Sequence, residues 1–102
     1  MSELAVDSPM QVFKPQNMIG PKLTFDKVEV YNNRIEHIQG ALGRDRRTIY
    51  FSKITNVRVK KALVGDRATI WLDTAGHGGF ELVLEGYPKV LAELLQERVA
   101  AN

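Results

Sequence analysis

Basic side chains are concentrated in the middle of this 102-residue chain. Between Arg44 and Arg67 there are eight basic and two acidic residues, a net charge of +6, whereas the rest of the chain carries −4. Such an uneven field can steer an anionic partner, and the arginine fork matches the geometry of phosphate oxygens. The candidate residues for an anion-binding site are therefore Arg44, Arg46, Arg47, Lys53, Arg58 and Lys60. The alternative, which the sequence favours over the site, is a solvated face partly neutralised by Asp45 and Asp66.

Two aromatic residues, Tyr50 and Trp71, lie in segments with the pattern of strands and are predicted to form part of an interface. Tyr31 joins them if the partner is single-stranded nucleic acid, because such binders stack bases on aromatic side chains. The nearly balanced net charge of +2 and the lack of a recognised motif disfavour nucleic acid. A protein partner, including a second copy of the chain, is the favoured interpretation.

Groups that support catalysis or bind a metal are sparse. The chain has no cysteine, and its two histidines, His37 and His77, show no spacing typical of the three or four ligands of a zinc site. No nucleophile motif is present. The carboxylates in the strand patterns are predicted to be exposed rather than to form an acid/base pair, namely Asp26, Glu29 and Glu36. We therefore predict no enzymatic activity, no metal and no cofactor, with structural or solvated histidines.

Apolar residues alternate with polar ones from Leu23 to Glu85, the pattern of half-buried strands. The break at Asp26 and Lys27 predicts a small turn or bulge within the first strand. The glycine-rich segment 76–79 lies between two strands, which favours a hairpin turn over a phosphate-binding loop, since the latter joins a strand to a helix. Strands are predicted at 23–31, 34–38, 46–51, 54–60, 68–74 and 80–85.

The hydrophobic period changes after Pro88, a residue that suits the first turn of a helix. A helix is predicted over 88–101, with a broad core-packing face formed by Val90, Leu91, Leu94, Leu95 and Val99. Because a helix of this length is only marginally stable alone, we expect it to pack on the sheet.

Residues 1–17 contain two prolines and have no clear period, so a flexible N-terminal arm is predicted, with one optional edge strand around 11–13. Residues 18–102 are then one domain, because 102 residues are too few for two stable cores. The N-terminus is acidic where a secretion signal is basic, and no run reaches the roughly 18 apolar residues of a membrane span. A cytoplasmic location is the default expectation.

This order of elements resembles that of bacterial pleckstrin-homology-like (PH-like) domains. The resemblance rests on residues 23–30, on a strand, short break and Ile-x-x-Val start at 47–59, on the hairpin 68–85, and on the helix 88–101. It implies a mainly β (α+β) fold, an antiparallel partial barrel or roll capped by one C-terminal helix. In eukaryotic relatives a loop between early strands at the open end of the barrel holds anionic head groups. Arg44, Arg46 and Arg47 would occupy a corresponding loop here.

Three functions follow from these observations. The first hypothesis is a non-enzymatic protein-interaction or assembly module, homo-oligomeric as bacterial members of the family often are, that uses sheet edges and exposed aromatic residues. The alternative is binding to anionic phospholipid head groups at a membrane surface through the Arg44–Arg47 loop. Nucleic-acid binding ranks third.

Overall fold

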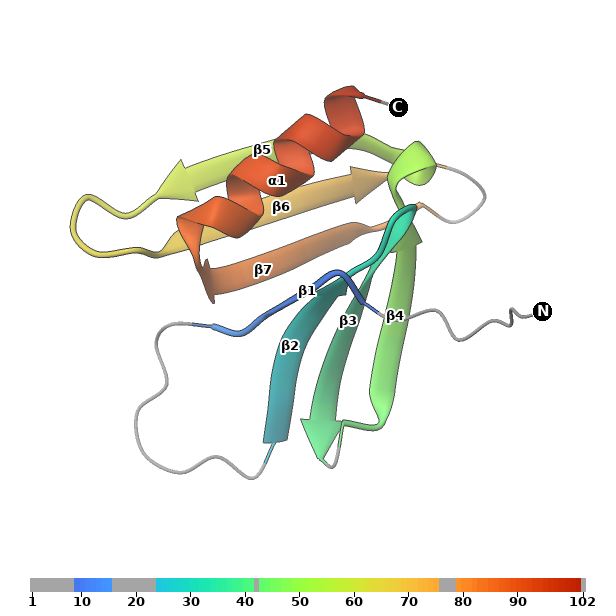
Figure 1. The fold of residues 1–102 in the computed structure, drawn as a ribbon, viewed down its shortest axis with the longest axis horizontal. Coiled ribbons are helices and arrows are strands. Elements are labelled where there is room, and N and C mark those ends of the chain that lie inside the picture. The colour runs from blue at the N-terminus through green and yellow to red at the C-terminus, as the bar shows by residue number, and fades with distance from the viewer. Residues whose placement is uncertain (1–8, 16–23, 42, 76–78, 102) are drawn as a thin grey trace.

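The described part of the chain forms two antiparallel sheets, of four and three strands, followed by one helix (Figure 1). The computed structural model describes residues 9–15, 24–41, 43–75 and 79–101. The first sheet has the order β1 (Gln11–Phe13), β2 (Thr24–Val30), β3 (Arg34–Ala41) and β4 (Asp45–Tyr50). The second has the order β5 (Ile54–Lys61), β6 (Ala68–Thr74) and β7 (Glu81–Tyr87).

A short 3-10 helix, η2 (Phe51–Lys53), turns the chain from the first sheet into the second. The strand predicted to end at Phe51 ends at Tyr50, because η2 begins at Phe51, whose side chain is buried in the core. In Figure 1 the strands of the second sheet run across those of the first. These open antiparallel sheets with a C-terminal helix confirm the predicted mainly β fold, a PH-like partial barrel.

One face of each sheet contributes side chains to a common core. Val30, Ile35 and Ile49 lie in register across β2, β3 and β4, and Leu72 of β6 lies opposite Leu82 of β7. Because side chains alternate between the faces of a strand, the predicted period of two places these residues on the inner faces. The core cluster comprises Val28, Val30, Ile35, Ile49, Phe51, Ile54, Ala68, Ile70, Leu72, Leu82, Leu84, Tyr87, Leu91, Ala92 and Leu95.

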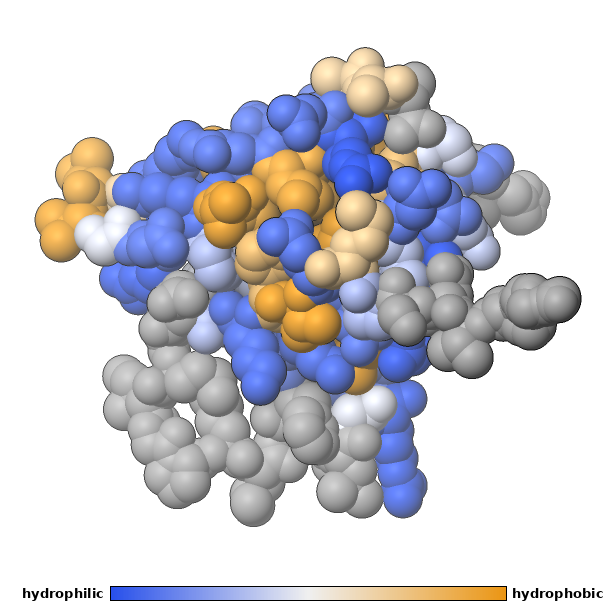
Figure 2. All heavy atoms as spheres, viewed as in Figure 1, coloured by the Kyte–Doolittle hydropathy of each residue, from blue (hydrophilic) through white to orange (hydrophobic). Residues whose placement is uncertain are grey.

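The helix α1 (Lys89–Ala100) begins after Pro88 and packs against β5, β6 and η2 (Figure 1). Leu91, Ala92 and Leu95 are buried beneath it. The prediction that Val90 belongs to the buried face is wrong, because about half of this side chain is exposed. Figure 2 shows apolar surface over α1 on this side of the molecule. No helix among the described elements has the length and apolar character needed to span a bilayer.

The predicted turn or bulge at Asp26 and Lys27 is wrong. The pairing of β2 with β3 runs without a shift from Thr24 opposite Ala41 to Val30 opposite Ile35. An irregularity does occur in the second sheet, between β6 and β7, where Gly86 adopts a positive φ of 72°. The predicted glycine turn, with His77, lies outside the described residues except for its last position.

Candidate functional site

A hollow of about 270 Å³ lies where β4 and η2 meet the end of β6 and the start of β7. Two aromatic side chains border it, Tyr50 with 47% and Phe80 with 40% of its surface exposed, whereas Ile49 is buried. We call it the Tyr50–Phe80 hollow; it is lined by Thr48, Ile49, Tyr50, Lys53, Thr74, Ala75 and Phe80. It offers exposed aromatic surface beside an edge strand.

Hydrogen bonds hold the borders of the Tyr50–Phe80 hollow in place. The Ala75 N–H donates to the Lys53 carbonyl oxygen at 2.7 Å, which ties the end of β6 to η2. The Thr74 hydroxyl donates to the Phe80 carbonyl oxygen at 2.8 Å and accepts from the Phe80 N–H at 2.9 Å. The guanidinium of Arg47 lies over the Phe80 ring, 4.7 Å from its centre. The hollow is therefore preformed, with Arg47 and Lys53 supplying positive charge at its border.

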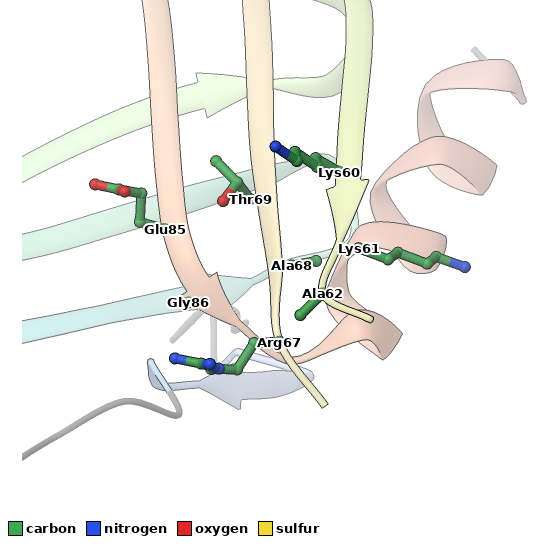
Figure 3. Close-up of a pocket in the computed structure, with 8 residues that line it drawn as sticks. All are labelled: Lys60, Lys61, Ala62, Arg67, Ala68, Thr69, Glu85 and Gly86. Atoms are coloured by element: carbon green, nitrogen blue, oxygen red, sulfur yellow. The ribbon is translucent and has the colours of Figure 1, made fainter. Parts of the chain in front are cut away.

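A second hollow, of about 300 Å³, lies at the base of the β5–β6 hairpin (Figure 3). Lys60, Thr69 and Glu85 come from β5, β6 and β7 and project to one side of the sheet, as does Arg67. Lys61 points the other way, toward α1, where its ammonium lies 3.2 Å from a Glu93 carboxylate oxygen. Within the described residues neither Lys60 nor Arg67 forms an ion pair. The hollow therefore keeps two free cations beside one carboxylate.

A polar cluster of buried Tyr87 and His37 with the partly exposed Asp26 joins β7 to the first sheet. The Tyr87 hydroxyl donates a hydrogen bond to Asp26 Oδ1 at 2.5 Å, and His37 Nε2 lies 3.0 Å from the same oxygen. Burial, and then the bond to the Asp26 carboxylate and its charge, raise the pKa of Tyr87, so its hydroxyl stays protonated. His37 is buried and its ring meets that of Tyr87 edge to face. This cluster fixes the two sheets relative to each other.

The prediction that Glu29 and Glu36 are exposed is wrong, because these residues are only 9% and 7% exposed. They lie opposite each other on β2 and β3. Arg46 on β4 reaches both, with its Nη1 atom 3.4 Å from a Glu29 oxygen and in closer contact with Glu36. Arg34 adds a bond of 2.8 Å to Glu36, and the Tyr31 hydroxyl donates to Glu29 at 2.9 Å. We call these five residues the carboxylate network.

The charges in the carboxylate network oppose the effect of burial on the two glutamates. Burial raises the pKa of Glu36, but hydrogen bonds from Arg34 and Arg46 and their positive charges outweigh it and leave the pKa lowered. For Glu29, burial is likewise outweighed by bonds from Tyr31 and from a neighbouring lysine. Both carboxylates are therefore ionised at neutral pH and serve as partners for arginine rather than as an acid/base pair.

Residues 24–102 match the model of the bacterial PH domain family, a stretch that covers β2 through α1. The chain is a bacterial PH domain. Domains of this class are generally binding modules rather than catalysts. Searches among curated proteins and among solved structures found no match. In the described part of this PH domain, no group of three or more histidine, aspartate or glutamate side chains converges as a metal site requires.

The structure does not gather the predicted anion site of the PH domain into one place. Arg46 is held in the carboxylate network, and Arg47 stacks on Phe80. These two arginines also line an open hollow of about 340 Å³ with His37, Gln39 and Asp45. Arg44 is exposed at the turn that follows β3. Two of the three predicted arginines in segment 44–47 therefore already contact other side chains of the domain.

The other three predicted cations lie in the second half of the PH domain. Arg58 is ion-paired with Glu81, and its guanidinium lies 5.4 Å from the centre of the Trp71 ring. Lys60 lines the hollow at the base of the β5–β6 hairpin, and Lys53 lines the Tyr50–Phe80 hollow. The six residues are thus divided among several surfaces, although Arg46 and Arg47 share one hollow and Arg47 and Lys53 both border the Tyr50–Phe80 hollow.

Of the two predicted interface residues, Tyr50 borders a hollow and Trp71 lies on the outer face of β6. Trp71 sits in register between Arg58 and Val83, which gives the outer face of the second sheet an apolar centre. Phe80 was not singled out from the sequence. One signal in the sequence could have identified Phe80 as exposed: it directly follows a glycine turn, and side chains at the end of a hairpin have little cover.

Replacing Tyr87 with phenylalanine is expected to lower the free energy of unfolding by about 1 kcal/mol, because Asp26 Oδ1 loses a short hydrogen bond in a partly buried position. Urea denaturation at neutral pH measures the effect. The matched control is Tyr50→Phe, since the Tyr50 side chain is about half-exposed. A cost for Tyr87→Phe no greater than that of the control would contradict the role given to this bond.

Proposed function

We propose that this bacterial PH domain is a non-enzymatic interaction module that binds an extended, acidic segment of a partner protein along the edge of β4. One apolar side chain of that segment enters the Tyr50–Phe80 hollow. The observation that carries the proposal is a preformed hollow with exposed aromatic walls directly beside an edge strand.

The position of β4 supports this mode of binding. β4 is the last strand of its sheet and pairs only with β3 among the described strands. An added strand gains main-chain hydrogen bonds from such an edge, while pockets for alternate side chains supply specificity. Tyr50 is the last residue of β4, so the hollow lies in line with a segment that pairs with this strand.

The size of the Tyr50–Phe80 hollow favours a side chain over a cofactor. Its volume of about 270 Å³ lies at the lower end of the roughly 300–1,000 Å³ typical of small-molecule sites, which suits one side chain. Aromatic residues such as Tyr50 and Phe80 supply a large part of the binding energy at protein interfaces when a partner covers them.

The charge along β4 favours an acidic partner over a second copy of the chain. Arg44, Arg47 and Lys53 are exposed here, with Asp45 as the one opposing charge in the segment 44–53. Charged edge strands resist pairing with themselves, because like charges of two copies are brought together. Head-group binding by the Arg44–Arg47 turn has less support, because Arg46 is committed to the carboxylate network.

The test uses a fluorescein-labelled peptide of strand-forming residues with a central phenylalanine flanked by glutamates, and a matched peptide with lysines in place of the glutamates. Fluorescence polarisation is expected to show binding of the acidic peptide and at least about tenfold weaker binding of the lysine peptide. Phe80→Ala is expected to weaken binding of the acidic peptide about tenfold, the 1.4 kcal/mol expected for one interface anchor.

The matched control is Val83→Ala, since Val83 is as exposed as Phe80 but lies on the outer face of β7. Equal binding of the two peptides, or equal losses from Phe80→Ala and Val83→Ala, would refute the proposal. Sedimentation velocity distinguishes an acidic partner from a second copy of the chain. A dimer that Phe80→Ala dissociates would mean that a second copy, and not an acidic partner, occupies the hollow.

A further inference from the structure

Two apolar side chains stand in solvent at the turn between β5 and β6. Leu63 is fully exposed, at 102%, and Val64 is 83% exposed. The Ala62 N–H donates to the Arg67 carbonyl oxygen at 2.9 Å, which closes the hairpin behind them. A Cβ atom added at Gly65 would meet no atom within 4 Å. The end of the turn is tied to α1, because the Lys89 N–H donates to Asp66 Oδ1 at 3.3 Å. We call residues 62–66 the hairpin tip.

The hairpin tip is a projection and not a groove. In Figure 1 it extends beyond both sheets at one end of the long axis, and in Figure 2 the same end forms an apolar knob. Single exposed apolar residues are ordinary on protein surfaces. The pair Leu63 and Val64 differs, because these two residues are adjacent at a convex end and the described part of the domain does not cover them. A protein partner would need a matching cavity, whereas a lipid bilayer needs none.

Positive charge surrounds the base of the hairpin tip. Lys60 and Lys61 precede it and Arg67 follows it, with Asp66 as the one acidic residue among them. Lys60 and Arg67 form no ion pair among the described residues and border the hollow of Figure 3 with one carboxylate, that of Glu85, while Lys61 is paired with Glu93. An apolar point above free cations is complementary to a bilayer whose surface is anionic and whose interior is apolar.

We propose that the hairpin tip docks this PH domain on an anionic membrane surface. Leu63 and Val64 enter the boundary between head groups and acyl chains, and Lys60 and Arg67 bind lipid phosphates. This surface is formed by β5, β6 and their turn, whereas the Tyr50–Phe80 hollow lies where β4 and η2 meet the end of β6 and the start of β7. The membrane proposal is therefore independent of the proposed peptide site, and each can fail without the other.

The first experiment is flotation of the full chain with vesicles of phosphatidylcholine alone and of phosphatidylcholine mixed with phosphatidylglycerol. Binding is expected only to the anionic vesicles and is expected to weaken as salt is added. The double variant L63S/V64S is expected to lower the partition coefficient at least about tenfold, because it removes the apolar area that the bilayer covers. Arg67→Ala is expected to lower it about fivefold.

Two variants serve as controls for these losses. Val83→Ser removes an exposed apolar residue from the outer face of β7. Arg44→Ala removes an exposed arginine from the β3–β4 turn. Each is expected to leave partitioning within about twofold of the unmodified domain, since a single charge distant from the membrane contributes little.

A second experiment reports the depth of the hairpin tip directly. Because the chain has no cysteine, Leu63→Cys carries a single nitrobenzoxadiazole label, and Ser52→Cys in η2 is the matched exposed control. The label at position 63 is expected to shift to the blue with anionic vesicles, and the label at position 52 is not.

Three outcomes would overturn the proposal. The first is no partitioning into either kind of vesicle. The second is an equal loss from the tip variants and from Val83→Ser or Arg44→Ala. The third is a dimer in sedimentation velocity that L63S/V64S dissociates, which would make the hairpin tip a contact between two copies.

Discussion

Replacement of Leu95 with alanine is expected to lower the free energy of unfolding of this PH domain by about 3 kcal/mol. Leu95 is fully buried in the core cluster, where α1 packs against β5, β6 and η2. Removal of its branched end leaves a cavity that neither sheet can fill without breaking its own register. For a domain of this size, the change is expected to lower Tm by more than about 12 °C. Urea and thermal denaturation followed by circular dichroism measure both quantities.

The control for this substitution is Gln96→Ala, one position further along the same helix. Gln96 is exposed, and its replacement is expected to change the free energy of unfolding by less than about 0.5 kcal/mol. If Leu95→Ala cost no more than about 1 kcal/mol, α1 would not be packed against the core as the structure has it.

The sequence predicts the inner faces of the sheets well, because a period of two identifies them without any knowledge of which strand pairs with which. Val28 and Val30, or Ile70 and Leu72, are buried in the structure as their alternation predicts. The buried face of the helix is predicted less accurately than the inner faces of the sheets. Its pattern identifies the residues that share a face, but not how much of that face has a sheet beneath it. Leu91 and Leu95 are covered, whereas Val90 in the first turn is not.

The error at β2 has a specific physical cause. The apolar residues change phase between Phe25 and Val28, and this change predicted an interruption at the polar Asp26, which is in phase with Val28 and Val30. In the structure it keeps that phase and accepts hydrogen bonds at the end of the sheet, including the one from Tyr87 on β7. A polar residue at an inward position has the same appearance in the sequence whether it marks a bulge or a long-range hydrogen bond.

The candidate sites depend on contacts that no local pattern contains. Tyr50 and Phe80 are thirty positions apart and come together because η2 turns the chain at the corner between the sheets. Their convergence could not be predicted from alternation. The hairpin tip is different, since Leu63 and Val64 stand beside a glycine in a turn between two strands. The exposure of these two side chains was nevertheless not predicted and is a finding of the structure.

The burial of Glu29 and Glu36 is the feature that the sequence was least able to predict. Alternation places both on the outer face of the first sheet, which is correct, but their cover comes from the long side chains of Arg34 and Arg46. This cover requires the register in which Glu29 lies opposite Glu36 on neighbouring strands. Two like charges directly opposite each other destabilise a sheet unless a counter-charge reaches both. Arg46 is that counter-charge.

Replacement of Arg46 with methionine is therefore expected to lower the free energy of unfolding by about 2 kcal/mol at pH 7. Methionine keeps the packing of the side-chain stem but removes the one charge that reaches both carboxylates, and leaves Glu36 with Arg34 and Glu29 with Lys27. Breaking a fully buried ion pair costs about 3–5 kcal/mol. The smaller value applies here because the Arg46 side chain is 49% exposed, so water replaces part of its effect. Arg44→Met, at the exposed position directly before β4, is the matched control. It is expected to lower the free energy of unfolding by less than about 0.5 kcal/mol.

The pH dependence of this loss identifies its cause. In the unmodified domain the pKa values of Glu29 and Glu36 are lowered from 4.5, so their ionisation stabilises the fold above that pH and the benefit is lost as the pH falls through the lowered values. Without Arg46, Arg34 and Lys27 still favour ionisation of Glu36 and Glu29, but no single charge reaches both carboxylates. Protonation at low pH then relieves the repulsion between them. Urea denaturation of both forms between pH 7 and pH 3.5 is therefore expected to show a difference in stability that shrinks toward low pH. A difference that stays constant over this range would mean that Arg46 stabilises the sheet by packing and not by its charge.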